Sequence, residues 1–272
     1  LTKCIHSSKP EIIFHLAAQP QVLESYNQPL ETIKTNIIGT ANLLEITRTL
    51  KYVKAVVVIT TDKVYKNLNK NVKFKESATL GGDDIYSSSK ASADMLTASY
   101  EKSFFNKNTN IASVRAGNCI GGGDWTKFRI LTDSVNAFSK NKILKLRNPS
   151  YRRPWQHVLE PLNGYLMLAE KLYSNKGKNF TGPWNFGPAS RQNMKVYQLS
   201  KIIRQKLNSQ SKILIKKLIS FEVDFKISLP NLFILFLKIL EFSFFLINLS
   251  ILKINCCKLL ILNDCLLCLR RL

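Results

Sequence analysis

The sequence contains a tyrosine and a lysine four residues apart, Tyr86 and Lys90. On a helix this spacing places the phenol and the ammonium on one face, one turn apart. A cation near a phenol stabilises the phenolate, so we expect the pair to lower the phenol pKa from about 10 toward neutrality. Such a phenolate can take a proton from an alcohol. The same spacing also occurs on solvent-exposed helices, so the surrounding residues must decide between these interpretations.

A second polar group directly follows a predicted buried strand over 53–59. It consists of Thr60, Thr61, Asp62 and Lys63. In open α/β sheets, ligands bind at the carboxyl ends of parallel strands. An ordinary helix or turn cap would need no lysine at this point. We therefore predict that these four residues belong to a binding or catalytic site.

The elements that must position these groups alternate between strands and helices. Apolar runs over 10–18 and 111–114 have the character of parallel strands buried on both faces. Amphipathic helices are predicted over 30–50 and 86–105. The residues expected to point inward are Ile33, Ile37, Leu44 and Ile46 in the first helix and Ala91, Met95, Leu96 and Tyr100 in the second.

This alternation predicts an α/β fold with a doubly wound, Rossmann-like parallel sheet. We assign residues 1–118 to the sheet domain and residues 119–207 to a small substrate-binding lobe. Helices are expected in this second region near 130–139, 158–173 and 196–207. Residues 208–272 form a third part with a different composition.

The last part of the chain is unusually rich in Ile, Leu and Phe, which make up more than half of residues 211–272. The last glycine is Gly187, although turns in a globular domain normally need glycines. A shifted reading frame in an AT-rich gene is the interpretation that this composition favours. The alternative is a membrane anchor over 231–252, but Lys238 and Glu241 near its middle would each cost about 2.5 to 3.5 kcal/mol on insertion.

Composition limits the classes of partner. The net charge of +22 comes from 40 Lys and Arg against 18 Asp and Glu, which favours an anionic ligand. Nucleic-acid binding is not predicted, because the lysines form no basic block or aromatic-interleaved stripe. Cys265 and Cys268 lack a second ligand pair at a zinc-like spacing, so we predict no metal site. No secretory leader pattern begins the sequence, and a cytoplasmic location is expected.

Several longer motifs accompany the Tyr-x-x-x-Lys pair. They are His15-Leu16-Ala17-Ala18-Gln19-Pro20, Asn36-x-x-Gly39-Thr40, Thr61-Asp62-Lys63, Arg115-Ala116-Gly117-Asn118, Gly121-Gly122-Gly123-Asp124-Trp125 and Arg153-Pro154-Trp155-Gln156-His157. With them, residues 10–207 resemble the extended short-chain dehydrogenase/reductases and, more narrowly, the CDP-glucose 4,6-dehydratases. Asp62-Lys63 separates the chain from the related dTDP-glucose dehydratases, which carry Asp-Glu at this point.

The resemblance implies a lyase that converts CDP-D-glucose to CDP-4-dehydro-6-deoxy-D-glucose through an internal NAD redox cycle. Tyr86, assisted by Lys90 and Thr61, would remove the proton of the sugar 4-hydroxyl while NAD takes the hydride from C4. Asp62 would protonate the departing C6 hydroxyl. Lys63 stands where related enzymes carry the base for the C5 proton, and it must be neutral to accept that proton.

The resemblance also implies binding roles and a homodimer. The NAD contacts would be Ala17, Ala18, Gln19, Asn36, Thr60, Tyr86 and Lys90. Asn118 and Arg153 would grip the diphosphate of the nucleotide sugar. If the family resemblance is set aside, the sequence fits other interpretations of two of these residues. Asn36 is then equally well explained as a buried helix residue that bonds to a neighbouring loop, and Arg153 as a cation on the surface.

The chain also departs from this family. A glycine-rich first turn normally holds the dinucleotide pyrophosphate, and Gly121-Gly122-Gly123 comes too late in the chain to be that turn. We therefore expect about 70 residues of the first strands and helices to be missing, and the chain as given to be inactive. Two alternatives stay open: another nucleotide-sugar dehydratase or epimerase acting on GDP-mannose or UDP-sugars, and a non-catalytic assembly fragment.

Overall fold

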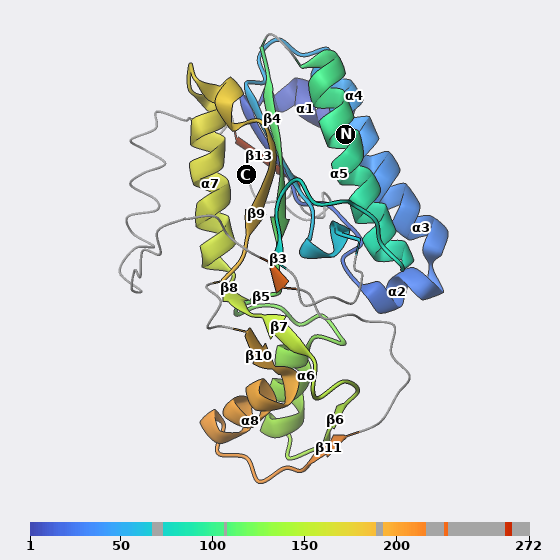
Figure 1. The fold of residues 1–272 in the computed structure, drawn as a ribbon, viewed down its shortest axis with the longest axis vertical. Coiled ribbons are helices and arrows are strands. Elements are labelled where there is room, and N and C mark those ends of the chain that lie inside the picture. Colours follow the sequence, from blue (N-terminus) through green and yellow to red (C-terminus); the bar gives the residue numbers. More distant parts are fainter. Residues whose placement is uncertain (67–72, 106–107, 189–192, 216–225, 228–258, 263–272) are drawn as a thin grey trace.

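Parallel strands form the centre of the fold (Figure 1). The computed structural model describes residues 1–66, 73–105, 108–188, 193–215, 226–227 and 259–262. The central strands are β1 (Ile12–His15), β2 (Ala55–Ile59), β4 (Asn110–Ala116), β9 (Gly182–Phe186) and β13 (Leu259–Leu262). Their order is β13-β1-β2-β4-β9, and every adjacent pair is parallel. The predicted α/β fold with a parallel sheet is confirmed.

Helices cover both faces of this sheet (Figure 1). One layer contains α1 (Thr2–Ser8), α2 (Val22–Asn27), α3 (Pro29–Ile33), a π-helical segment (Lys34–Ile38), α4 (Gly39–Arg48) and α5 (Ile85–Phe104). The opposite layer is α7 (Leu159–Tyr173). A sheet buried on both faces needs apolar residues on both, which explains the continuous apolar runs of its strands.

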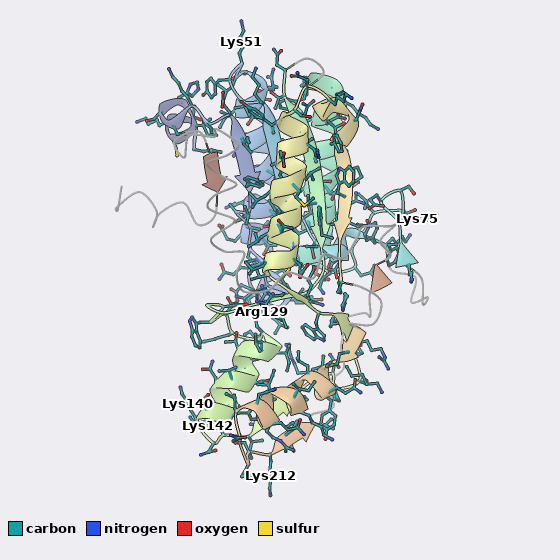
Figure 2. All side chains as sticks on the ribbon, turned by 90° about the vertical axis from the view of Figure 1, so that its left-hand side faces the viewer. Lys51, Lys75, Arg129, Lys140, Lys142 and Lys212 are labelled. Carbon is teal, nitrogen blue, oxygen red and sulfur yellow. The ribbon has the colours of Figure 1, made fainter. Side chains whose placement is uncertain are left out.

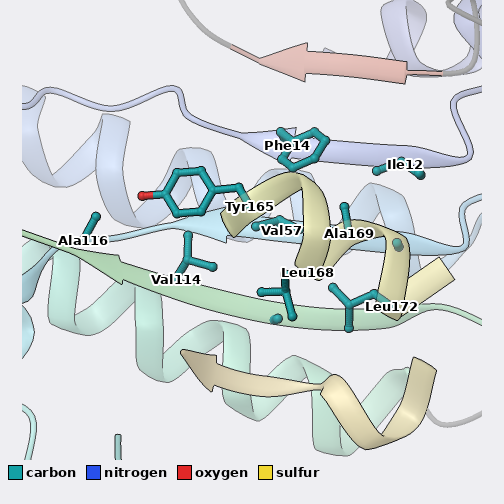
Figure 3. Close-up of a cluster of buried hydrophobic side chains, with 11 residues drawn as sticks. Ile12, Phe14, Val57, Val114, Ala116, Tyr165, Leu168, Ala169 and Leu172 are labelled. Carbon is teal, nitrogen blue, oxygen red and sulfur yellow. The ribbon is translucent and has the colours of Figure 1, made fainter. Parts of the chain in front are cut away.

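Successive side chains of the strands point to opposite faces, so each strand serves both layers. Val56 and Val58 pack in the cluster that contains α4. Phe14, Val57 and Val114 pack under α7 (Figure 3). Burying each of these side chains contributes about 1.5 to 3 kcal/mol, so the alternation fixes the position of both helical layers.

The helix predicted over 30–50 forms as three consecutive helical segments. Leu44 is buried as expected, and Ile46 packs against the same core. In the first half of the helix the residues that pack inward are instead Thr32, Asn36 and Thr40, whereas Ile33 and Ile37 are only partly buried. Hydrophobic spacing missed this face because its contacts are hydrogen bonds between polar side chains. One example is the bond of 2.9 Å from Asn36 Nδ2 to Ser89 Oγ on α5.

Helix α5 begins where a cap fixes it: Asp84 Oδ1 accepts a hydrogen bond of 2.9 Å from the backbone N–H of Ser87. The helix forms as predicted, but Met95 is 49% exposed and not part of the core. The buried face instead carries Tyr86, Lys90 and Asp94 at intervals of four residues. These polar residues can be buried because partners in the sheet layer satisfy them.

Beyond the sheet lies a smaller lobe (Figure 1). Its core is Phe138, Leu144, Leu146, Leu199 and Ile203. It contains the helices α6 (Ile130–Ser139) and α8 (Val196–Lys206), and the strands β5 (Cys119–Ile120), β6 (Leu144–Leu146), β7 (Arg152–Pro154), β8 (Gln156–His157), β10 (Asn193–Lys195) and β11 (Ile213–Ile215).

The chain leaves the sheet after β4 and returns to it with α7 and β9. The structure therefore differs from the expected boundary at residue 118, since 159–186 belong with the sheet and not with the lobe. The reason is that β9 adds a fifth parallel strand beside β4, and a parallel strand needs a long crossover, which here carries the lobe.

The structure describes only short segments of residues 208–272. The short strand β3 (Lys73–Phe74) pairs with β12 (Lys226–Ile227), and β13 pairs along β1. The segment 231–252, considered above as an alternative membrane anchor, and the Cys265–Cys268 pair lie outside the described residues. Among the described helices, none is long and apolar enough to span a membrane.

Gly177 tests the packing of α7 on the sheet. A Cβ at this position would overlap the carbonyl oxygen of Leu172 and Nδ2 of Asn110, whose own hydrogen bond measures 2.7 Å. We expect Gly177→Ala to lower the free energy of unfolding by about 1 to 3 kcal/mol in urea titrations. Gly122→Ala is the control, because within the described chain its Cβ would meet open space. Equal stability of the two variants would contradict this packing.

Candidate active site

A cavity of about 500 Å³ lies between the carboxyl edge of the sheet and the lobe. The strand ends contribute Thr60, Thr61, Asp62 and Lys63 after β2 and Asn118 after β4. Further lining residues are Tyr86 at the start of α5 and Arg129, Arg147, Tyr151 and Arg153 from the lobe. The structure thus gathers into one cavity the groups that the sequence predicted from separate elements.

Thr61 is the bridge between Tyr86 and Asp62. A hydrogen bond joins the side chains of Tyr86 and Thr61. Thr61 Oγ1 lies 3.1 Å from Asp62 Oδ1, to which it donates, and it accepts a bond of 3.4 Å from the backbone N–H of Lys63. All three linked side chains are buried. Phenol, hydroxyl and carboxylate thereby form a connected chain along one wall of the cavity.

The phenol of Tyr86 is less acidic than the sequence predicted. Burial raises the pKa of Tyr86 to about 12; the hydrogen bond with Thr61 and the charge of Arg129 lower it, and the charges of Asp62 and Asp84 raise it. The predicted lowering by Lys90 is therefore wrong. Lys90 Nζ donates a bond of 2.9 Å to the carbonyl of Ile59, and burial lowers the pKa of Lys90 itself to about 8.

Asn36 connects elements and does not line the cavity. Its Nδ2 donates to the carbonyl oxygen of Gln19 at 3.1 Å, and its Oδ1 accepts from the backbone N–H of Gln19 at 2.8 Å. The loop after β1 is thereby fixed against the π-helical segment. Of the described residues, Ala17, Ala18, Gln19, Asn36 and Lys90 lie outside the cavity lining, while Thr60 belongs to it.

Two polar groups of the cavity are suited to an anion. Asn118 Nδ2 is buried and has no hydrogen-bond partner among the described residues. Arg153 is buried, with its guanidinium over the ring of Tyr151 at 5.3 Å. A buried amide hydrogen without a partner is costly, so a ligand oxygen at this point would satisfy it.

Sequence reasoning missed Arg129 and Arg147 in the cavity lining. Arg129 lies between the sheet and the lobe, far from the labelled lysines at the two ends of the molecule (Figure 2). Arg129 directly precedes α6, and Arg147 directly follows β6. Neither belongs to one of the motifs described above, so only the three-dimensional fold brings them to the cavity. In the described part of the chain, no group of three His, Cys, Asp or Glu side chains could hold a metal ion.

His15 is a neutral buried group behind the site. Thr40 Oγ1 donates to the carbonyl of Asn36 at 2.8 Å, so its bond of 2.9 Å with His15 must use the Nε2 proton of the imidazole. Burial and the nearby charge of Lys90 lower the pKa of His15 to about 4. Its Nδ1 is buried without a partner within the described ranges.

Comparisons with known proteins identify the family of the chain. The family model described as GDP-mannose 4,6 dehydratase matches residues 1–182. The chain belongs to this family. The chain is 47% identical over 194 residues to a CDP-glucose 4,6-dehydratase of Salmonella typhimurium. The aligned residues make up 69% of this chain and 54% of that protein. It is also 31% identical over 152 residues to a dTDP-D-glucose 4,6-dehydratase of Dictyostelium discoideum, covering 52% of the chain and 34% of that protein.

The chain thus spans about half the length of the Salmonella protein. Solved structures share the family's fold. A UDP-glucose 4-epimerase from Thermotoga maritima superposes with a TM-score of 0.72 at 22% identity, covering 83% of this chain and 70% of its own. A dTDP-glucose 4,6-dehydratase from Bacillus anthracis gives a TM-score of 0.69 at 24% identity, covering 83% and 66%.

His15 predicts how stability depends on pH. In the unfolded chain the imidazole takes up a proton near pH 6.5, whereas in the fold it stays neutral to about pH 4. The unfolded state therefore binds more protons in this window, so stability falls as the pH falls, by about 2 kcal/mol at pH 5.

Urea unfolding at about pH 7 and about pH 5 measures this loss. His15→Gln, which can still bond to Thr40, is expected to show a smaller fall than the unmodified protein. His157→Gln, at an exposed position, serves as the control and should keep the full fall. An unchanged pH dependence in His15→Gln would contradict the assignment.

Proposed function

We propose that this chain carries the catalytic site of a CDP-glucose 4,6-dehydratase, which converts CDP-D-glucose to CDP-4-dehydro-6-deoxy-D-glucose and water. The single observation that carries the proposal is the common cavity of Tyr86, Thr61, Asp62 and Lys63, with Asn118 and Arg153 at its lobe side. The 47% identity to the Salmonella enzyme supports the choice of substrate.

NAD is the cofactor that this reaction class requires, and the residues present fit its reactive half. Small side chains follow β1, and Ile59, Thr60 and Tyr86 form the wall on which a flat ring could lie. When bound, NAD would accept a hydride from the sugar C4 and later return it to C6. The residues proposed to hold it are Ala17, Ala18, Gln19, Asn36, Thr60, Tyr86 and Lys90.

Tyr86 is the proposed base for the sugar 4-hydroxyl. Its phenol is protonated at neutral pH, so its deprotonation requires positive charge nearby. Arg129 at the cavity is the cation that lowers the pKa of this phenol, and the family resemblance gives Lys90, on the same helix face, the role of assisting it. Thr61 holds the phenol in place and can pass its proton toward Asp62, since it donates to that carboxylate.

Asp62 and Lys63 are the proposed groups for the loss of water. A ketone at C4 acidifies the C5 proton, which neutral Lys63 would take, while Asp62 gives a proton to the departing C6 hydroxyl. Asp62 is close to Gly117, where a Cβ would lie 3.5 Å from Asp62 Oδ2. This close approach at the end of β4 leaves Asp62 directed along the cavity wall.

The diphosphate is proposed to bind Asn118 and Arg153. A charge-assisted bond from a guanidinium contributes about 1.5 to 3 kcal/mol, so Arg153→Ala should weaken the binding of CDP-glucose by about 10- to 100-fold in calorimetric titrations. The exposed Arg48, which pairs with Glu45, provides a matched control through Arg48→Ala. Equal affinities of the two variants would contradict this subsite.

Turnover tests the reaction itself. The full-length gene product is incubated with NAD and, in parallel, CDP-glucose, dTDP-glucose, UDP-glucose or GDP-mannose, and products are analysed by mass spectrometry. The proposal predicts that CDP-glucose loses one water fastest. Faster loss of water from GDP-mannose or UDP-glucose would assign the site to another member of the family, and binding without any product would support the non-catalytic alternative.

A homodimer and a cytoplasmic location complete the proposal. Exposed apolar side chains lie on the outer helical layer, including Leu30, Ile38, Met95 and Phe104. These helices, α3 to α5, lie together on one side of the sheet (Figure 1), and a second copy would cover them. Sedimentation equilibrium that returns only monomers at micromolar concentration would contradict the dimer.

A further inference from the structure

Asp94 is a buried carboxylate with several hydrogen-bond donors around it, and the reaction described above gives it no role. Its side chain is buried on α5. Oδ1 accepts from Arg115 Nη2 at 2.7 Å and Ser113 Oγ at 3.2 Å, and Oδ2 accepts from Arg115 Nε at 2.9 Å. Thr60 Oγ1 lies 3.0 Å from Oδ2 and 3.0 Å from the carbonyl oxygen of Val114, so its one proton is shared between these two acceptors. Both carboxylate oxygens of Asp94 are thus bonded by more than one donor group.

The partner of Asp94 is held equally firmly. Arg115 Nη1 donates to the hydroxyl of Tyr65 and to the carbonyl of Glu76, both at 2.9 Å. Its other two nitrogens form the bidentate pair with Asp94, so the guanidinium cannot turn. Asp94 therefore joins α5 to a rigid point on β4.

This pair acts on the catalytic face because of where Asp94 lies on its helix. Tyr86, Lys90 and Asp94 follow each other at intervals of four residues and share one face. Asp94 bonds Thr60, and Lys90 bonds the carbonyl of Ile59, the residue before it. These two bonds thus fix α5 to Ile59, the last residue of β2, and to Thr60, which directly precedes Thr61.

The charge of Asp94 also reaches Lys90. The titratable groups that interact with this ammonium are Asp94 on its own helix and His15 from β1. Burial lowers the pKa of Lys90 to about 8, and Asp94 is the charge that raises it. Lys90 would thus lose its proton near neutral pH without this carboxylate.

We propose that Asp94 is the positioning residue of this active site: it fixes the position of Tyr86 relative to Thr61 and places a carboxylate one helical turn from Lys90. The proposal rests on the proposed function, because it concerns the groups that remove the proton of the sugar hydroxyl. It assigns Asp94 no contact with the substrate.

Asp94→Asn tests it by keeping the shape and removing the charge. Turnover of CDP-glucose near pH 8 should fall by about tenfold or more, and the alkaline limb of the pH–rate profile should move down by about one unit or more. KM should stay within about twofold, because Asn118 and Arg153 are untouched. A merely structural role would lower the rate equally at every pH.

Glu101→Gln is the matched control. Glu101 is a carboxylate on the same helix with its own partner, Lys178 at 2.8 Å. It lies about 16 Å along the axis from Lys90, whereas Asp94 lies about 6 Å away. The pH–rate profile of Glu101→Gln should coincide with that of the unmodified enzyme.

A buried arginine without its partner can prevent folding, so a second variant removes both charges. Asp94→Asn with Arg115→Gln leaves no unpaired charge in the core and should show the same downward movement of the alkaline limb. The proposal would be overturned if either variant folds and has the same turnover rate and the same alkaline limb of the pH–rate profile as the unmodified enzyme.

A titration without substrate separates this proposal from the proposed function. Carbon-13 NMR of labelled lysine follows Lys90, whose signal is assigned by its loss in Lys90→Arg. The midpoint should lie near 8 in the unmodified protein and lower by about one unit or more in Asp94→Asn. If CDP-glucose is not turned over, the proposed function fails, and an unchanged midpoint in Asp94→Asn overturns the role of Asp94 independently.

Discussion

The buried pair of Asp94 and Arg115 is the interaction on which the geometry of the site depends. It joins a helix to the neighbouring strand inside the sheet layer, at the end where the cavity opens. Burying two charges is costly, and a bidentate pair with every donor and acceptor satisfied is the arrangement that offsets this cost. Because the pair admits one geometry, it gives α5 one position relative to the strand ends.

The rest of the site follows from the direction of the strands. Parallel strands bring their carboxyl ends to one edge, so Thr61 after β2 and Asn118 after β4 face the same space. The crossover between β4 and β9 is long enough to carry a lobe over that edge. Arg153 reaches the cavity from this lobe, which closes it on the side opposite Tyr86.

Much of this arrangement could be predicted from the sequence, because apolar strands and their polar ends are local signals. Thr61, Asp62 and Tyr86 were found from spacing and position alone, and the cavity contains them. The inward face of α5 was predicted only in part: Ala91 is buried as expected, but Met95 is exposed, because most of the buried face is polar and hydrophobic spacing cannot detect it. The pKa of Tyr86 was also predicted wrongly, since the spacing of Lys90 shows nearness but not burial.

The contribution of the lobe could be predicted only through family motifs. Arg153 was assigned from its motif, whereas Arg129 and Arg147 come to the cavity through the folding of residues that are distant in sequence. Asp94 had a usable signal, because it continues the interval of four residues set by Tyr86 and Lys90. A carboxylate on the buried face of a helix needs hydrogen-bond donors in the core. For Asp94 this donor is Arg115, which lies in the strand that follows α5.

A crystal structure of the protein with CDP-glucose bound tests the central claim most directly. The account predicts the hexose between Tyr86 and Asp62, with the sugar O4 within hydrogen-bond distance of the Tyr86 hydroxyl and the diphosphate on Asn118 and Arg153. A hexose bound elsewhere, or oriented with C4 away from Tyr86, would contradict it.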